Sequence, residues 1–149
     1  MTNNLEVEIK LLNSFAKLPT FGSAAAAGAD LYAATDYDIT IQPHQTVKID
    51  TGLAMAIPAG YFGAIFARSG LATKQGLRPA NCVGVIDSDY RGPVIVALHN
   101  DSDEEQVIPA KSRIAQIIIM PCPRVEFTIV DELDDTKRGE GGFGSTGIK

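Results

Sequence analysis

The segment Val47–Ala67, VKIDTGLAMAIPAGYFGAIFA, is the part of the chain that most directly indicates the fold. Val47–Ile57 and Tyr61–Ala67 are rich in apolar residues, and Pro58–Gly60 stands between them. Proline and glycine together favour a tight turn. The segment is therefore predicted to form two strands joined by a turn, and Gly52 is a candidate β-bulge.

Short apolar runs on both sides of this segment extend the pattern. Leu5–Leu11 alternates apolar and charged residues, as a half-buried strand does. Ile114–Met120 is almost wholly apolar, which is typical of a fully buried strand in the centre of a sheet or at a subunit interface. Further strands are predicted over Ala29–Ala34, Ile39–Ile41, Cys82–Ile86, Val94–His99 and Val125–Val130.

The connections between these runs complete the predicted architecture. Cys82–Ile86 and Val94–His99 flank a polar connection and are expected to form a hairpin, whereas Asn13–Ser23 is expected to be a loop. Gly70–Gly76 is the best candidate for the only helix. Apolar runs recur about every ten residues with turn residues between them, which predicts a single all-β domain, a barrel or a sandwich.

The composition limits the classes of function. The chain has 149 residues, of which 45% are hydrophobic, so it can bury a core of its own. Its net charge of −5 argues against broad nucleic-acid binding, and a polyphosphate ligand would need local arginines or a divalent cation. We expect no membrane association, because no apolar stretch reaches roughly 20 residues and the N-terminus does not resemble a signal peptide.

Cysteine and histidine content narrows the candidate sites. Cys82 and Cys122 lie in apolar runs without a CxxC pattern, so buried free thiols and a cytoplasmic location are expected. His44 and His99 are too few and too far apart for a structural zinc site, and both are expected to face solvent in loops. Walker-type and GxSxG motifs are absent from the sequence, which removes support for a P-loop or a serine hydrolase.

Two early polar segments have both a functional and a structural interpretation. Asp30 follows a glycine turn and is either a carboxylate near a divalent metal, directly or through water, or an ordinary turn residue. Arg68, Ser69 and Gly70 precede the predicted helix, where arginine, hydroxyl and amide groups can bind an anion. The alternative is that Ser69 caps the helix and Arg68 is a surface residue.

Two later segments are equally ambiguous when each is taken alone. Asn81–Gly92 contains Asp87, which leaves a predicted strand end where a catalytic base would be held rigidly, and the flat side chain of Tyr90. The alternative is an aspartate-rich hairpin turn. Gln116 is a polar residue in an apolar run and needs a partner, either a ligand or the protein itself.

The C-terminal segment Arg138–Gly147, RGEGGFGSTG, contains five glycines together with residues that can bind a nucleotide. Arg138 can bind phosphate, the glycine amides and hydroxyls can donate to phosphate oxygens, and Phe143 can stack on a base. The segment is therefore either a lid that orders on a phosphorylated planar ligand or a plain flexible terminus.

The segments discussed above are AGADL (Ala27–Leu31), RSGLATKQGL (Arg68–Leu77), NCVGVIDSDYRG (Asn81–Gly92), RIAQ (Arg113–Gln116) and RGEGGFGSTG (Arg138–Gly147). In order and spacing, these five segments resemble the five motifs of the trimeric deoxyuridine triphosphatase (dUTPase) family. One departure is Ala67, where the family usually has proline before Arg-Ser-Gly.

The resemblance implies a jelly-roll-like β-barrel with a core over about residues 1–135 and a C-terminal lid over 136–149. It also implies a homotrimer with active sites at subunit interfaces, and hydrolysis of dUTP to dUMP and pyrophosphate with magnesium. Asp87 resembles the base that orients the attacking water, Tyr90 the residue packed on the sugar, and Asn81 with its hairpin backbone the uracil reader. Asp30 resembles the carboxylate that holds magnesium through water. The other substrate-binding residues implied are Arg68, Ser69, Gly70, Val85, Gln116, Arg138, Phe143, Gly144, Ser145 and Thr146.

Two other functions remain compatible with the sequence. A dCTP deaminase of the same fold would need an acid/base near the amino group of the base, and its tail would usually be less glycine-rich. A non-enzymatic module that senses dUTP or binds a protein would have no need of an oriented water. The presence of Asp87 together with the glycine-rich tail favours the hydrolase.

Overall fold

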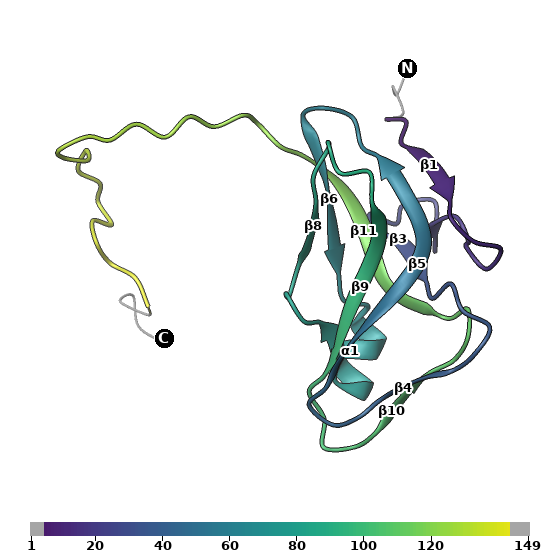
Figure 1. Cartoon of the computed structure of the whole chain (residues 1–149). Helices are drawn as coiled ribbons and strands as arrows, with labels where there is room; N and C mark the ends of the chain where they lie inside the picture. The colour runs from purple at the N-terminus through teal and green to yellow at the C-terminus, as the bar shows by residue number, and fades with distance from the viewer. Residues whose placement is uncertain (1–4, 144–149) are drawn as a thin grey trace.

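The two predicted strands around Pro58–Gly60 form, but each belongs to a different sheet. A computed structural model describes residues 5–143 (Figure 1). In it, β5 (Thr46–Ala56) and β6 (Tyr61–Phe66) are joined by a turn in which the Tyr61 amide donates to the Pro58 carbonyl over 3.2 Å. The turn therefore carries the chain from one sheet to the other instead of closing a hairpin.

Over the described residues 5–143, the strands form two main antiparallel sheets and one small one. The first sheet has the order β1-β5-β9-β7, the second β2-β3-β11-β6-β8, and β4 pairs with β10. The remaining elements are β1 (Glu8–Leu11), β2 (Thr20–Phe21), β3 (Ala29–Tyr32), β4 (Ile39–Ile41), α1 (Ser69–Gln75), β7 (Leu77–Pro79), β8 (Gly84–Ile86), β9 (Pro93–Asn100), β10 (Gln106–Ile108) and β11 (Arg113–Pro121). This arrangement confirms the all-β, jelly-roll-like class, although the sheets stay separate and do not close into one barrel within this range.

The core is built from apolar side chains that alternate along the strands. In β9, Val94, Val96 and Leu98 are buried while the residues between them are not, which is the period of two that a strand imposes. Leu31 of β3 and Ile114 of β11 are fully buried. Burying each such side chain contributes about 1.5–3 kcal/mol, so this alternation drives the association of the sheets.

Two local predictions about strands are confirmed in part. Gly52 lies at a register shift between β5 and β9 and has a φ of 67°, so the predicted bulge forms. β11 is central in its sheet, between β3 and β6, as its apolar composition indicated. Its last residues are less buried than predicted, however, because Ile118 and Ile119 are half-buried and Met120 is exposed in the single subunit.

Several connections differ from the predictions because pairing between distant segments decides them. β8 pairs with β6 and β9 with β5 and β7, so the predicted hairpin between β8 and β9 is wrong. The predicted loop Asn13–Ser23 contains the short strand β2, and β7 was not predicted. Both arise where an edge strand gains backbone hydrogen bonds that local sequence does not specify.

The predicted environments of the cysteines and one histidine are also wrong. Cys82 and Cys122 are free thiols, as expected, but both are exposed because they lie just outside strands. His99 is only 23% exposed in its side chain, because it belongs to β9 and its Nδ1 lies 2.9 Å from the Thr46 hydroxyl. His44 is exposed in a turn, as expected.

After β11 the chain leaves the body of the protein. Residues 122–143, here called the C-terminal arm, run away from both sheets (Figure 1). The strand predicted over Val125–Val130 is wrong: this segment is irregular, and Phe127 and Ile129 are 94% and 99% exposed. Within residues 5–143, no helix has both the length and the apolar character needed to cross a membrane.

Candidate active site

One rung of the second sheet brings together two of the sequence motifs and lies next to a third. Gln116 of β11 lies opposite Asp30 of β3 on one side and opposite Phe66 of β6 on the other. We call these three positions the polar rung. Because β6 ends at Phe66, the chain continues directly into Arg68 and α1, so the motif at the start of the helix lies at the same end of the sheet.

Two arginines converge on the carboxylate of Asp30. Arg68 donates through Nε to Asp30 Oδ1 over 2.9 Å, and Arg113 donates through Nη1 to Oδ2 over 3.2 Å. The Asp30 side chain is 15% exposed, that of Arg68 26% and that of Arg113 51%. Two guanidinium groups against one carboxylate leave a net positive charge at this end of the sheet, with unused N–H donors suited to phosphate.

The Gln116 side chain is held in place by its own partners. Its Nε2 donates to the carbonyl oxygen of Ala67 over 2.9 Å. A Cβ atom on Gly28 would lie 2.5 Å from Gln116 Oε1, so glycine at this position lets the Gln116 side chain lie against the segment without shifting. This arrangement ties the AGADL, RSG and RIAQ segments to one another.

The helix start differs from one of the predicted alternatives. Arg68 is the N-cap residue, with extended backbone at φ −83° and ψ 130°, and Ser69 is the first helical residue rather than the cap. The Ser69 carbonyl accepts a hydrogen bond from the Thr73 hydroxyl over 2.7 Å. Ser69 and Gly70 are exposed, so their hydroxyl and amide groups are open to a ligand.

The turn that carries Asn81 lies at the same end of the sheet. Gly84, the first residue of β8, is opposite Ile65, one residue before the polar rung. The Asn81 side chain is exposed, and its Nδ2 lies 3.6 Å from the position that a Cβ on Gly84 would take. Cys82 has a φ of 63°, and the Val83 amide donates to the Asn81 carbonyl over 2.7 Å, so the turn is tight.

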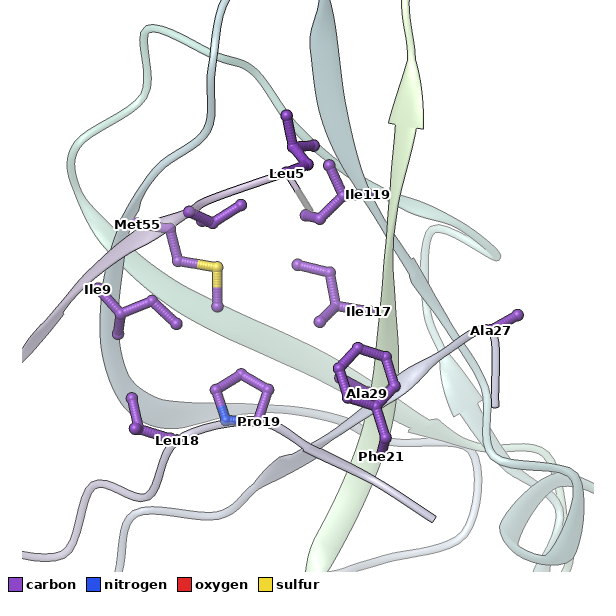
Figure 2. Close-up of a pocket in the computed structure, with 11 residues that line it drawn as sticks. Leu5, Ile9, Leu18, Pro19, Phe21, Ala27, Ala29, Met55, Ile117 and Ile119 are labelled. Carbon is purple, nitrogen blue, oxygen red and sulfur yellow. The ribbon is translucent and has the colours of Figure 1, made fainter. Parts of the chain in front are cut away.

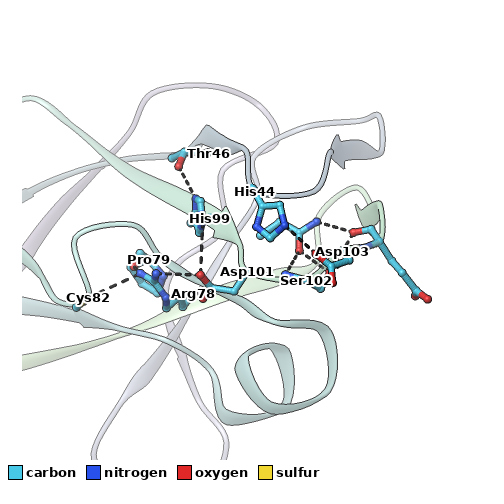
Figure 3. A network of polar contacts seen from close by, with 11 residues as sticks. His44, Thr46, Arg78, Pro79, Cys82, His99, Asp101, Ser102 and Asp103 are labelled. Carbon is cyan, nitrogen blue, oxygen red and sulfur yellow. Dashed lines mark hydrogen bonds and ion pairs between the residues drawn. The ribbon is translucent and has the colours of Figure 1, made fainter.

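A polar network outside the site supports this turn (Figure 3). Arg78 of β7 donates through Nε and Nη2 to the two carboxylate oxygens of Asp101, over 2.6 and 3.0 Å, and through Nη1 to the Pro79 carbonyl over 3.2 Å. The hydrogen bond from Arg78 lowers the pKa of Asp101 below its ordinary value of 3.8. The same bond raises the pKa of Arg78. The pair therefore fixes the chain just ahead of Asn81.

Asp87 and Tyr90 lie farther from the polar rung of their own chain. Ile86, the last residue of β8, is opposite Gly63, whereas the rung meets β6 at Phe66. Three residues of strand at about 3.3 Å each separate these positions by about 10 Å, and Asp87 lies beyond Ile86. Asp87 and Tyr90 are exposed, and the Tyr90 amide donates to the Asp87 carbonyl over 3.1 Å. Val85, on the same strand, is 60% exposed.

The predicted lid residues are farther still. Arg138 and Phe143 lie on the C-terminal arm, away from both sheets (Figure 1). Arg138 Nε donates to the Gly141 carbonyl over 2.8 Å, and Phe143 is fully exposed. Gly144, Ser145 and Thr146 lie outside the described residues. One subunit thus brings together Asp30, Arg68, Gln116 and the Asn81 turn, but not Asp87, Tyr90 or the arm.

A separate hollow, distinct from the polar rung, is apolar. A cavity of about 630 Å³, here called the apolar groove, opens between β1, β2, β3 and β11 (Figure 2). An apolar lining does not suit a triphosphate, so this hollow is not the catalytic pocket. Its lining residues are Leu5, Val7, Ile9, Leu18, Pro19, Phe21, Ala27, Ala29, Met55, Ile117 and Ile119.

The residues fit only an indirect role in metal binding. Within residues 5–143, no group of three or more His, Cys, Asp or Glu side chains is placed to hold a metal ion. Both carboxylate oxygens of Asp30 already accept hydrogen bonds from arginines. Asp30 can therefore contact a cation's water shell through its remaining lone pairs, but the main ligands would have to come from a bound substrate.

Two main antiparallel sheets, with two arginines gathered on one carboxylate at the end of the second sheet, define a jelly-roll-like β protein. The family model described as dUTPase matches residues 15–147. The chain is 50% identical to the deoxyuridine 5'-triphosphate nucleotidohydrolase of Desulfitobacterium hafniense (strain DSM 10664 / DCB-2), over 98% of this chain and 99% of that protein. The corresponding protein of Syntrophotalea carbinolica is 44% identical, over 97% and 98% of the two chains. The chain belongs to the dUTPase family.

The similarity extends to a solved structure. The Staphylococcus bacteriophage 80alpha dUTPase with dUPNHPP superposes with a TM-score of 0.88 at 29% identity, over 99% of this chain and 100% of that one. The resemblance in the sequence, and with it the enzyme class of dUTP diphosphatase, is thereby confirmed. Sequence reasoning assigned no role to Arg113 or Gly28. Their presence in the RIAQ and AGADL motifs was the available signal, but only the fold shows that they contact Asp30 and Gln116.

Proposed function

We propose that the protein hydrolyses dUTP to dUMP and pyrophosphate by attack of a water oriented by Asp87 on the α-phosphate. The observation that carries this proposal is the convergence of Arg68 and Arg113 on Asp30 beside Gln116, in a chain of the dUTPase family. In the cell this reaction would supply dUMP for thymidylate synthesis and keep uracil out of DNA.

The polar rung and the helix start would bind the triphosphate. Phosphoryl transfer depends mainly on positioning and on neutralising the charge of the phosphate oxygens. The half-buried Arg68 and the exposed Ser69 and Gly70 follow one another at the start of α1 and would serve this purpose. Gln116 would contact phosphate or water through its carboxamide oxygen, because its Nε2 is engaged by Ala67.

Magnesium would contribute the remaining positive charge. When bound together with the substrate, magnesium would supply charge neutralisation that an acidic protein lacks. Asp30 would hold it through water, while its two arginines keep the carboxylate oriented. This division of roles agrees with the absence of a protein metal cluster among the described residues.

The segment from Asn81 to Tyr90 would bind the nucleoside. Asn81 and its tight turn, together with Val85, would recognise uracil, because a fixed backbone leaves the donor of cytosine unpaired. Tyr90 would pack against the deoxyribose and leave no room for a 2′-hydroxyl. Asp87 would hold the 3′-hydroxyl and act as general base toward the attacking water.

A homotrimer with shared active sites would complete each site. Asp87, Tyr90 and the C-terminal arm lie away from the polar rung of their own chain, so other subunits would supply them. Val125, Phe127 and Ile129 alternate along the arm and are 62%, 94% and 99% exposed, a pattern that requires a partner surface. The apolar groove offers such a surface, and we propose that the arm of a neighbouring subunit covers it (Figure 2).

The last part of the chain, residues 136–149, would serve as a lid. Arg138, Gly144, Ser145 and Thr146 would approach the terminal phosphates, and Phe143 would stack on uracil. We propose a single domain with a core to about residue 135 and a lid over 136–149. The two free thiols, Cys82 and Cys122, support a cytoplasmic location, where thiols stay reduced.

Pyrophosphate release from dUTP, dCTP, dTTP and UTP, each with and without magnesium, tests this proposal. We expect release from dUTP alone, increased by magnesium. Binding of dUTP without release would indicate a sensing module instead. Ammonia released from dCTP would indicate a deaminase.

A further inference from the structure

The ring of Tyr90 lies directly over the backbone of Gly92. A Cβ atom built on Gly92 would lie 2.4 Å from Tyr90 Oη, 2.6 Å from Cζ and 2.9 Å from Cε2. Contacts between heavy atoms are ordinarily about 3.5–4.0 Å, so no side chain fits between the ring and the backbone. The φ of Gly92 is outside the left-handed region, so a side chain here would disturb the Tyr90 ring and would not strain the backbone.

The hydroxyl of Tyr90 fixes the ring from its far end. Tyr90 Oη donates to the Pro93 carbonyl over 3.0 Å, at the first residue of β9. The Tyr90 amide also donates to the Asp87 carbonyl, and Arg91 donates through Nη1 to the carbonyls of Ser88 and Tyr90, over 2.7 and 3.0 Å. Both ends of the side chain are therefore anchored within one closed loop between β8 and β9.

We propose that Gly92 and the hydrogen bond from Tyr90 to the Pro93 carbonyl set the position of the Tyr90 ring, and thereby the selection of deoxyribose over ribose. This inference rests on the proposed function, in which the ring excludes a 2′-hydroxyl. It makes Gly92 a positioning residue that acts through Tyr90 without touching the substrate. It also means that the Tyr90 hydroxyl is engaged by the protein, so that only the face of the ring meets the sugar.

The size of the predicted displacement supports this role. Relieving a contact of 2.4 Å to about 3.5 Å requires a ring movement of about 1 Å. A misplacement of about 1 Å can change a rate by about 100-fold, and rejection of an added hydroxyl by packing alone is about 100-fold. A methyl group at position 92 should therefore remove a large part of the discrimination.

The test compares Gly92→Ala with Gly22→Ala. Gly22 has open space within 4 Å of its Cβ position and no left-handed φ, so the same substitution there changes no contact. The first readout is the ratio of dissociation constants for the non-hydrolysable analogues dUpNHpp and UpNHpp. The second is the ratio of kcat/KM for dUTP and UTP. We expect both ratios to narrow by up to about 100-fold in Gly92→Ala, by the misplacement argument, and to stay at the wild-type value in Gly22→Ala.

A second background separates positioning from general damage. Adding Gly92→Ala to Tyr90→Ala should change neither ratio further, because the ring through which Gly92 acts is already gone. If Gly92→Ala narrowed the two ratios equally in the wild-type and the Tyr90→Ala backgrounds, the inference would be overturned. Should Gly92→Ala fail to fold, Tyr90→Phe keeps the ring and removes its bond to Pro93. The ratio should then narrow in the same direction, and an unchanged ratio would overturn the role of that bond.

The outcomes also separate this inference from the proposed function. Wild-type ratios in Gly92→Ala, with normal hydrolysis of dUTP, would overturn the positioning role and leave the enzyme assignment intact. A wild-type protein that binds neither analogue would overturn the proposed function, and with it the inference.

Discussion

Gln116 of β11 donates through Nε2 to the carbonyl oxygen of Ala67, 2.9 Å away, at the point where β6 ends and the chain turns into α1. The bond holds the backbone that presents Arg68, Ser69 and Gly70. A side chain from the neighbouring strand thus restricts the backbone at Ala67.

Replacing Gln116 tests this connection. Gln116→Leu keeps the approximate volume but leaves the Ala67 carbonyl without its donor, which should lower the free energy of unfolding by about 1–3 kcal/mol. The KM for dUTP should rise because the phosphate-binding segment is less well held. Urea denaturation and steady-state kinetics measure the two effects. Gln45→Leu, at an exposed position, is the control. An equal loss of unfolding free energy in both variants would contradict a stabilising role of the hydrogen bond between Gln116 and Ala67.

Asp87→Asn should retain nucleotide binding and lose most turnover. The amide keeps the shape of the side chain but cannot accept a proton from water, and a general base contributes about 10²–10⁴-fold to a rate. Single-turnover hydrolysis and binding of a non-hydrolysable analogue distinguish the two effects. Asp89→Asn, two residues further along the same exposed loop, should stay near wild type. Normal turnover in Asp87→Asn would refute the assigned base.

Deleting the residues after Arg138 should leave a folded trimer with very low activity. The described part of this segment is exposed or half-buried and lies away from both sheets, so its loss should not disturb the core, while the lid that we propose would be lost. Thermal unfolding and molar mass by light scattering should match those of the full chain, while pyrophosphate release falls. A truncated protein that unfolds, or that runs as a monomer, would contradict this prediction.

Phe127→Asp should dissociate the trimer without unfolding the subunit. Phe127 is 94% exposed on the arm of the isolated chain, so the substitution removes no contact within the subunit. It would place a charge in the apolar interface that we propose for the arm, which is costly when the charge is unpaired. Molar mass measured against protein concentration reports the effect. Thr128→Asp, on the alternate face of the same segment, should keep the wild-type mass.

The ion pair between Arg78 and Asp101 should make stability depend on pH in acid. The pKa of Asp101 is lower in the folded protein than its ordinary 3.8, so the pair stabilises the fold above that value. The contribution should be lost as the pH falls through about 4 toward the lowered pKa. The difference in thermal midpoint between wild type and Asp101→Asn should therefore be largest near neutrality and should vanish in acid. Asp36→Asn, at an exposed position, should show no such convergence.

Local patterns were sufficient for most of the strands. The alternation in Leu5–Leu11, the turn at Pro58–Gly60 and the bulge at Gly52 all depend on neighbours in the sequence, and each is present in the structure in whole or in part. The assignment of strands to sheets was less predictable. The strands before and after Asp87, β8 and β9, were expected to pair with each other. Instead, β8 pairs with β6, and β9 pairs with β5 and β7.

By itself, the sequence determined the all-β class, the five motifs and the family, because these depend on periodicity and on residue types at given spacings. Only the tertiary structure decided that Arg68 and Arg113 share Asp30, that Gly28 lies against Gln116 and Gly92 against Tyr90, and that the segment after β11 runs away from both sheets. Most of these features depend on residues that are distant in sequence, and the contact of Tyr90 with Gly92 depends on the path of the loop between them. Their free energies depend on packing in three dimensions, which no local pattern specifies.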